Sequence, residues 1–301
     1  MTNRPAARAT EEDGPKGFAF AISAYVLWGV FPIYMKALAH VPTMEVIAHR
    51  VLWSVPLALA ALALIGRTGD LRAAFRSPAT LRMAALTATL VSINWGVYVW
   101  SIAADRALDA ALGYYVNPLF SVLLGAVLLK ERLTPRQWTA IGIAAAAILV
   151  LLLETGRLPL VALALTASWG FYGFFRKTLP IGPNQGFALE VLLLFPAALA
   201  YLLWLGHAGA GSFGAGGRDT LLLLGCGLVT AGPLLLFANG AKRLRLSTIG
   251  MLQYITPTLV FLIAALAFGE EIGRGRTIAF PLIWAALIIY TADMLSRRTE
   301  S

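Results

Sequence analysis

The chain alternates between long apolar runs and short polar segments. Because the hydrocarbon core of a bilayer is about 30 Å thick, a membrane-spanning helix needs roughly 20 mostly apolar residues. Ten runs of the 301-residue chain are long enough, and between them no stretch is long enough for a soluble domain. The pattern therefore predicts an all-α integral membrane protein with ten transmembrane helices. They cover approximately residues 17–38, 44–65, 83–104, 107–129, 135–153, 158–178, 185–205, 219–241, 246–268 and 277–295.

Composition supports this prediction, and the charges give an orientation. Hydrophobic residues make up 59% of the chain and charged residues 13%, with a mean hydropathy of +0.76. The net charge of +9 raises the question of nucleic-acid binding. With a cytoplasmic N-terminus, however, 17 Lys and Arg residues fall in cytoplasmic segments and only 6 in the opposite loops. This is the positive-inside distribution, so both termini are predicted to be cytoplasmic. The basicity then reports topology, and membrane lipid rather than nucleic acid is the expected partner.

The two halves of the chain resemble each other at an offset near 140 residues. The pair Trp-Gly at 28–29 recurs at 169–170, and the pattern Tyr-x-x-Pro at 115–118 recurs at 254–257. Each half holds five predicted spans, an odd number, so the second half enters the bilayer from the opposite side. Inverted repeats are typical of secondary transporters, in which a central site is exposed alternately to the two faces. A duplication retained only for packing is the alternative. The predicted organisation is a tail at 1–16, repeats at 17–153 and 158–295, and a tail at 296–301.

Several short segments resemble a known family. The segments GYYVNP (113–118) and LLKERLTPRQW (128–138) are similar to the EamA type of the drug/metabolite transporter superfamily. The segments AHRVLWS (48–54) and NWGVY (94–98) are similar to its RarD, or chloramphenicol-sensitivity, branch. The resemblance implies a ten-helix inverted-repeat carrier of the bacterial inner membrane, with a central cavity between the halves. It also implies export of small metabolites, aromatic amino acids among them.

Two prolines lie at equivalent depths in the fourth and ninth predicted spans. Pro118 and Pro257 each remove a backbone donor and crowd the preceding turn, which costs about 3 kcal/mol in a soluble helix. In a bilayer the freed carbonyl needs another partner or water. We interpret them as a pair of hinges for opening and closing the two faces, and static kinks that improve packing are the alternative.

Polar and aromatic residues inside the spans are the candidate substrate contacts. Asn94, Tyr98 and Ser101 share one helical face, and Gly113, Asn117 and Ser121 share another. Such faces line a cavity or join helices by hydrogen bonds. Aromatic walls hold flat or apolar groups and attract ammonium groups, so a neutral or zwitterionic substrate is expected, although some rings could instead belong to the interfacial belt. The predicted cavity residues are Trp28, His49, Asn94, Tyr98, Trp100, Tyr114, Trp169, Tyr172 and Tyr254.

Two charged residues occupy equivalent positions in the second and seventh spans. A central Arg costs roughly 2.5–3.5 kcal/mol on insertion scales, so Arg50 should face a wet cavity or a partner. Glu190 is the acid well inside a span, and an Arg50–Glu190 pair across the halves is one hypothesis. The other is that both side chains reach the interface from helix ends. The neighbouring His49 could bind a substrate carboxylate, respond to protonation or simply hydrogen-bond in the bundle.

Other functional classes find little support. The chain contains no GxxxxGK[ST] loop, so we expect no ATP hydrolysis. One cysteine and three scattered histidines argue against a metal site, a cofactor or an intramembrane enzyme. Uniport and proton-coupled transport both remain open, and a broad-specificity drug efflux transporter is the alternative function. The nearly apolar spans 135–153 and 277–295 are assigned to the scaffold or to a homodimer interface.

Overall fold

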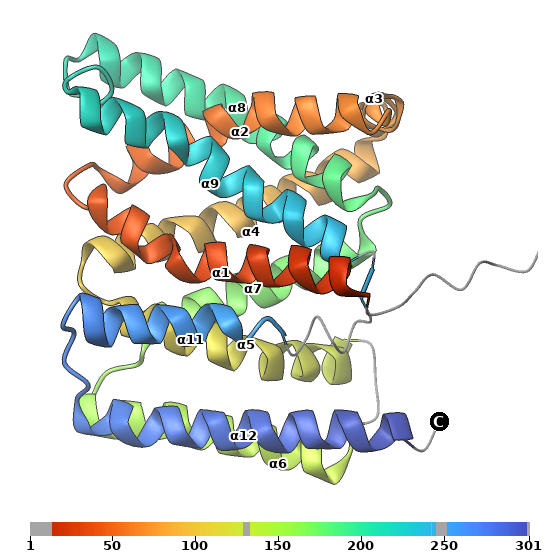
Figure 1. Ribbon diagram of the computed structural model, residues 1–301, viewed down its shortest axis with the longest axis vertical. Helices are drawn as coiled ribbons and strands as arrows, with labels where there is room; N and C mark the ends of the chain where they lie inside the picture. Colours follow the sequence, from red (N-terminus) through yellow and green to blue (C-terminus); the bar gives the residue numbers. More distant parts are fainter. Residues whose placement is uncertain (1–13, 129–132, 242, 245–251, 300–301) are drawn as a thin grey trace, which may run out of the picture.

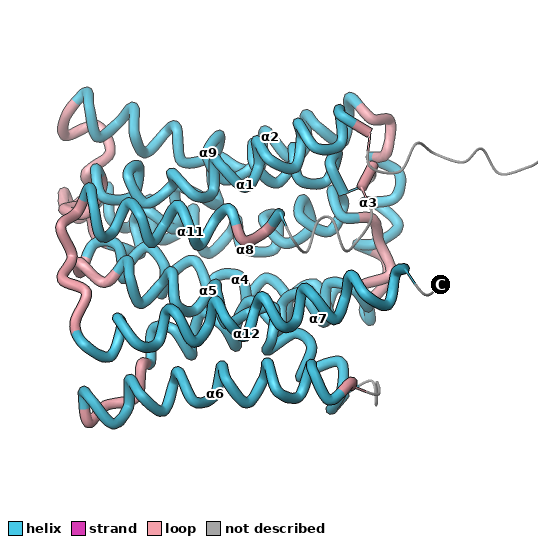
Figure 2. The backbone as a smooth tube through the Cα atoms, turned by 60° about the horizontal axis from the view of Figure 1, so that its bottom comes forward, coloured by secondary structure: helices cyan, strands magenta, loops and turns pink. Residues whose placement is uncertain are grey.

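A computed structural model describes residues 14–128, 133–241, 243–244 and 252–299, and all of its regular structure is helical (Figures 1 and 2). The first half contains α1 (Pro15–Ala37), α2 (Thr43–Leu64), α3 (Thr68–Phe75), α4 (Pro78–Ala103), α5 (Ala107–Leu128) and α6 (Pro135–Thr155). The second half contains α7 (Leu160–Thr178), α8 (Pro183–His207), α9 (Gly217–Ala241), α11 (Ile255–Leu262), the π-helix η1 (Ile263–Ala267) and α12 (Arg274–Thr299). The two ends of the described chain lie on the same side of the molecule, at the right of Figure 1.

Local sequence signals set several helix ends. α4 begins where the Ser77 hydroxyl accepts a hydrogen bond from the Thr80 N–H, so it starts earlier than the predicted span at 83. α6 begins at a capping box in which Thr134 and Gln137 each satisfy the other's backbone N–H. It ends at Gly156, whose φ of 61° suits a residue without a side chain.

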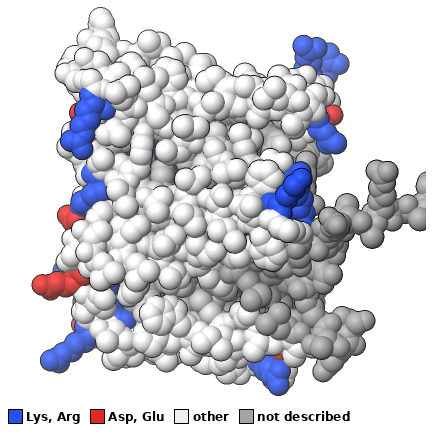
Figure 3. All heavy atoms as spheres, in the orientation of Figure 1, with Lys and Arg blue, Asp and Glu red and all other residues white. Residues whose placement is uncertain are grey.

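The helices are suited to a membrane, and the predicted number of ten spans stays a prediction. Among the described residues, eight helices are long and apolar enough to cross a bilayer, and two apolar helices are shorter, Leu160–Arg176 and Ile255–Ala267. The predicted span 246–268 lies partly outside the described residues, and its described part is divided between α11 and η1. Charged side chains gather toward the two ends of the helices and leave an uncharged belt between them on the face shown in Figure 3. An integral membrane protein has this distribution, because lipid tails exclude charge.

Several of the main helix contacts recur when the two halves are exchanged. The equivalent helices α2 and α8, α5 and α11, and α6 and α12 contact each other. The contacts α1–α9 and α1–α11 have their counterparts in α7–α4 and α7–α5. α1 and α7, which begin the halves, run in opposite directions across the molecule (Figure 1). The apolar core accordingly lies between the halves, in one cluster that includes α5, α6 and α12 and another that includes α2, α4 and α8.

The repeated Trp-Gly pair has a packing role in both halves. A Cβ atom at Gly29 would lie 2.5 Å from Leu259 Cδ1 of α11, and one at Gly170 would lie 2.4 Å from Phe120 Cδ1 of α5. Real carbon atoms need about 3.5 Å or more. Glycine at these positions therefore allows the first helix of each half to approach the fourth helix of the other half.

The helices α6 and α12 pack against each other within the chain. Ala140, Ala144 and Ala147 on α6 are buried, and α12 is the helix that packs most extensively on α6. Thr134 donates a hydrogen bond to Asp293 of α12 at 3.0 Å. Small residues at this seam let the two helices approach closely.

Candidate functional site

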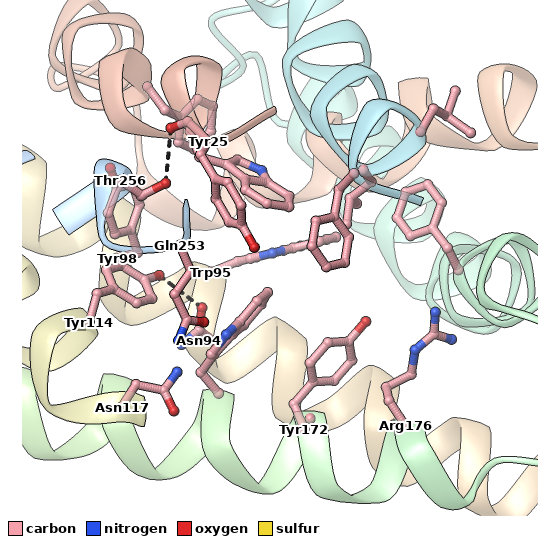
Figure 4. Close-up of a pocket in the computed structure, with 18 of the residues that line it drawn as sticks. Tyr25, Asn94, Trp95, Tyr98, Tyr114, Asn117, Tyr172, Arg176, Gln253 and Thr256 are labelled. Atoms are coloured by element: carbon pink, nitrogen blue, oxygen red, sulfur yellow. Dashed lines mark hydrogen bonds between the residues drawn. The ribbon is translucent and has the colours of Figure 1, made fainter. Parts of the chain in front are cut away.

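A cavity of about 580 Å³ lies between the two halves (Figure 4). It begins at Arg50, Tyr98 and Tyr114, in the third of α2, α4 and α5 that lies away from the chain ends. It extends to the connection 179–184 on the side of the chain ends. Its wall comes from both halves: Tyr25, Trp28, Phe31, Arg50, Asn94, Trp95, Tyr98, Tyr114 and Asn117 of the first, and Trp169, Tyr172, Gly173, Arg176, Leu179, Ile181, Asn184, Phe187, Leu234, Leu235, Phe237, Gln253, Thr256 and Pro257 of the second.

Six of the nine predicted cavity residues line this wall. They are Trp28, Asn94, Tyr98, Tyr114, Trp169 and Tyr172. Asn94 and Tyr98 are four residues apart on α4, so they share the face that α4 turns to the cavity. The seven-residue spacing places Ser101 on the same side, but its hydroxyl is used within α4, where it donates to the Tyr98 carbonyl at 2.7 Å.

Asn94 is the centre of a hydrogen-bond network that joins the halves. Its Nδ2 donates to the Ser168 hydroxyl at 3.0 Å and to the Leu165 carbonyl at 3.3 Å, both on α7. Its Oδ1 accepts from the Tyr114 hydroxyl of α5 at 3.1 Å, and Figure 4 shows this bond at the cavity wall. Because each of these polar atoms has a partner, the network orients the Tyr114 ring at the cavity wall.

Two groups of aromatic rings face the cavity from opposite helices. Tyr25, Trp28 and Phe237 contact one another with centroid separations of 5.7–5.9 Å. Trp169 and Tyr172 on α7 lie 5.2 Å apart. Both groups line the cavity, so a flat or apolar group inside it would meet ring surface from α1 and α9 on one side and from α7 on the other.

The predicted ion pair between Arg50 and Glu190 is not formed. Glu190 is 1% exposed and accepts hydrogen bonds from Arg176 Nη1 at 3.3 Å and from the Tyr172 hydroxyl at 3.1 Å. Arg50 instead donates from Nε to the Thr230 hydroxyl at 3.1 Å. The physical reason is that Arg176 lies close to Glu190 across the short connection between α7 and α8, and satisfies the carboxylate within its own half. Neither charge reaches the interface as the alternative reading required, since Arg50 is 4% exposed.

Three predicted cavity residues lie elsewhere. Trp100 is 45% exposed, beside Arg106, because a residue two positions after Tyr98 points to the opposite side of α4. His49 accepts a hydrogen bond from Trp53 Nε1 at 3.1 Å and stacks on Phe213, so the neighbouring Arg50 reaches the cavity in its place. Tyr254 packs against the apolar cluster that includes α5 and α12.

The two predicted hinge prolines have different surroundings. Pro118 is buried inside α5. Pro257 lies in the first turn of α11, where a missing N–H costs no intrahelical hydrogen bond, and it lines the cavity. The start of α11 at Ile255 lies two residues before Pro257, so the helix break is not at the proline itself. Hinge motion at either proline stays a prediction.

Contacts between the halves close the end of the molecule that faces away from the chain ends. The Glu45 carboxylate of α2 accepts hydrogen bonds from the Ser212 N–H at 2.7 Å and from its hydroxyl at 3.1 Å. The Glu270 carboxylate accepts from the first two N–H groups of α5 at 2.7 and 3.0 Å. Arg276 donates to Asp109 at 2.8 Å. We call these three contacts the closed end.

Sequence reasoning missed several wall residues. Asn117 was recognised as part of a polar stripe, but Phe31, Trp95, Arg176 and Gln253 were not identified. Because Arg176 lies near the end of a predicted span, the sequence indicates only that it belongs to the positive-inside distribution. A search for every polar or aromatic residue on the faces already assigned to the cavity could have found Trp95, which adjoins Asn94.

An all-helical membrane protein with an aromatic cavity between two similar halves belongs to the class of multi-pass membrane proteins that handle small molecules. The sequence profile described as the EamA-like transporter family matches the chain twice, over residues 15–153 and 158–292. The chain belongs to this family.

Relatives support the same assignment. A protein of Vibrio cholerae named "Uncharacterized transporter" is 43% identical over 286 residues, which is 95% of each chain. Protein RarD of Streptomyces exfoliatus is 40% identical, over 97% of this chain and 93% of RarD. A solved crystal structure has a similar fold, with a TM-score of 0.60 and 22% identity over 95% of this chain and 99% of the other. The family and the RarD homologues identify a membrane transporter.

Proposed function

We propose that the protein is a secondary transporter that exports small neutral or zwitterionic metabolites, aromatic and hydrophobic amino acids among them, across the bacterial inner membrane. The observation that carries this proposal is the cavity. Helices of both halves line it, and its wall combines many aromatic rings with a few amide and hydroxyl groups. Such a wall offers ring faces and hydrogen-bond partners to a substrate of this chemistry, whereas a polyanion would need several converging cations.

The proposed mechanism is alternating access between two inverted repeats of five spans each. Two observations support it: several of the main helix contacts recur when the two halves are exchanged, and α1 and α7 run in opposite directions. If the termini are cytoplasmic, as the charge distribution predicts, the cavity extends toward the cytoplasm and the closed end faces outward. Substrate would then enter from the cytoplasm, and rocking of one half against the other would open the closed end.

The test is release of labelled amino acids from liposomes that contain the purified full chain. Zwitterionic, cationic and anionic amino acids are loaded separately, with and without a pH gradient, which distinguishes uniport from proton coupling. Gly173 lines the cavity and has no atom within 4 Å of a Cβ, so Gly173→Trp should fill the cavity and stop release. Gly142 on α6 is equally unhindered and lies outside the cavity, so Gly142→Trp should release at the wild-type rate. Absence of release for every amino acid would refute the proposed substrate.

A broad-specificity drug efflux transporter is the second candidate, because the aromatic wall would also hold uncharged apolar drugs. Competition separates the two functions. Under the first, drugs do not slow amino-acid release. Under the second, they do, and they are themselves released.

A further inference from the structure

The inner end of the cavity holds a buried cation that lacks a counter-charge. Arg50 is 4% exposed, and its one side-chain hydrogen bond to a described residue runs from Nε to the Thr230 hydroxyl. Within the described parts of the chain, no carboxylate oxygen lies within 4.0 Å of the guanidinium, and Nη1 has no hydrogen-bond partner. The guanidinium also forms part of the cavity wall.

The surroundings of Arg50 compensate its charge only in part. The guanidinium carbon lies 4.4 Å from the ring centroid of Trp95 and 4.9 Å from that of Phe31. Ring faces of this kind attract a cation, but they supply no negative charge and accept no strong hydrogen bond. A buried charge without a partner is disfavoured, so the site is one negative charge short.

A second buried donor without a partner lines the same cavity. The Tyr98 hydroxyl has no hydrogen-bond partner among the described residues, although its neighbour Tyr114 has one in Asn94. The Tyr98 ring stacks on Phe31, the ring that also lies against the Arg50 guanidinium. Two orphaned donors and one positive charge are complementary to one carboxylate, whose two oxygens accept from the guanidinium fork.

The other cation in the cavity wall does not add to this charge. Arg176 is already paired with Glu190 at 3.3 Å. A phosphate or a dicarboxylate would bring a second negative charge for which the described wall offers no free cation. The arrangement therefore favours a molecule with a single carboxylate.

We propose that Arg50 and Tyr98 bind the carboxylate of the substrate, and that the rest of the substrate lies against the aromatic rings of the cavity. The proposal rests on the proposed function and narrows it to monocarboxylates, of which zwitterionic amino acids are the leading class. It excludes amines and amides as good substrates, because these would leave the guanidinium without its counter-charge.

The experiment measures binding to the purified full chain in detergent, independently of transport. A panel of the standard L-amino acids is tested, and the tightest binder is compared with its own amide and with the amine that lacks the carboxylate. We expect the amide and the amine to bind at least about 30-fold more weakly, which corresponds to about 2 kcal/mol at ~1.4 kcal/mol per tenfold.

Substitutions locate the site. Arg50→Met should weaken binding of the acid to the level of the amide. Arg50→Lys should recover part of the affinity, since it keeps the charge but loses the bidentate geometry. Arg136→Gln is the matched control, because it removes an exposed Arg outside the cavity and should leave affinity unchanged. Without ligand, Arg50→Met should unfold at the same or a higher temperature than wild type, since it removes an unpaired buried charge. Its loss of binding would then not reflect misfolding.

Three results would overturn the assignment: no amino acid binds, the acid and the amide bind equally, or Arg50→Met binds the acid as wild type does. If the acid binds through Arg50 but is not released from liposomes, the carboxylate site stands and the transport proposal fails. If release occurs without preference for the carboxylate, transport stands and the site is wrong.

Discussion

A single methyl group at Gly170 should destabilise the contact between α5 and α7. The added Cβ would lie 2.4 Å from Phe120 Cδ1 and 2.7 Å from Cε1, so the ring must retreat by about 1 Å to restore normal contact. Phe120 also packs edge-on against Phe171 at 5.7 Å, which limits that movement. Overpacking of this kind costs about 1–3 kcal/mol.

The free-energy cost of the clash can be separated from the gain in helix propensity with a control on the same helix. Replacing Gly by Ala inside a helix gains up to about 1 kcal/mol in propensity, and Gly173→Ala shares this gain without any atom within 4 Å of its Cβ. The difference in unfolding free energy between Gly170→Ala and Gly173→Ala therefore reports the clash alone, about 1–3 kcal/mol. Truncating the ring with Phe120→Ala should remove the difference, because the clashing atoms are gone.

The assay is reversible denaturation in mixed detergent micelles, followed by circular dichroism. The four variants are Gly170→Ala and Gly173→Ala, each alone and each combined with Phe120→Ala. Equal stabilities of Gly170→Ala and Gly173→Ala would refute the reasoning, as would a clash that persists in the Phe120→Ala background. The same comparison at Gly29, whose Cβ would meet Leu259, tests whether the repeated Trp-Gly pair has the same role in both halves.

Three further predictions concern the closed end, the buried acid and a proline. Glu45→Ala should speed amide hydrogen exchange at Ser212 and Phe213 by about tenfold or more, since their N–H groups lose a carboxylate acceptor; exchange that matches the control Glu271→Ala, an exposed acid, would contradict this. Glu190→Gln should lower the unfolding free energy by about 1–3 kcal/mol, because Arg176 loses its charged partner while Tyr172 keeps an acceptor, and an unchanged denaturation midpoint would count against it. Pro118→Ala should leave membrane insertion intact and slow release from liposomes, and a wild-type rate would exclude a hinge at this position.

The helices were predictable because membrane spans are specified by local composition. Ten apolar runs gave the positions of the long helices to within a few residues, and the pairing of Trp-Gly across the halves indicated equivalent helices. The short helix α3 was missed because its eight residues are too few for a membrane span, and it packs on α8, α4 and α2. The break before α11 was also missed, because an apolar run alone does not reveal where a span divides.

The candidate site was predictable only to the level of helix faces. Spacing placed Asn94 and Tyr98 together, and the same geometry argues against Trp100, which is two residues further on. Spacing could not show which of two adjacent polar residues, His49 or Arg50, turns to the cavity. Nor could it show that Arg176 reaches Glu190, because that contact depends on the path of the chain between α7 and α8.

The difference between Arg50 and Glu190 shows how a symmetric fold can hold an asymmetric site. The two residues occupy equivalent positions in the repeats, yet Glu190 has its counter-ion in Arg176, whose equivalent in the first half is the apolar Met35. Met35 cannot pair with Arg50, whereas Glu190 and Arg176 neutralise each other within the second half. Gly29 and Gly170 have the same packing role in the two halves, whereas the charged residues at equivalent positions differ. The uncompensated charge is at the inner end of the cavity, where a bound carboxylate would complete in the first half the pair that the second half already contains.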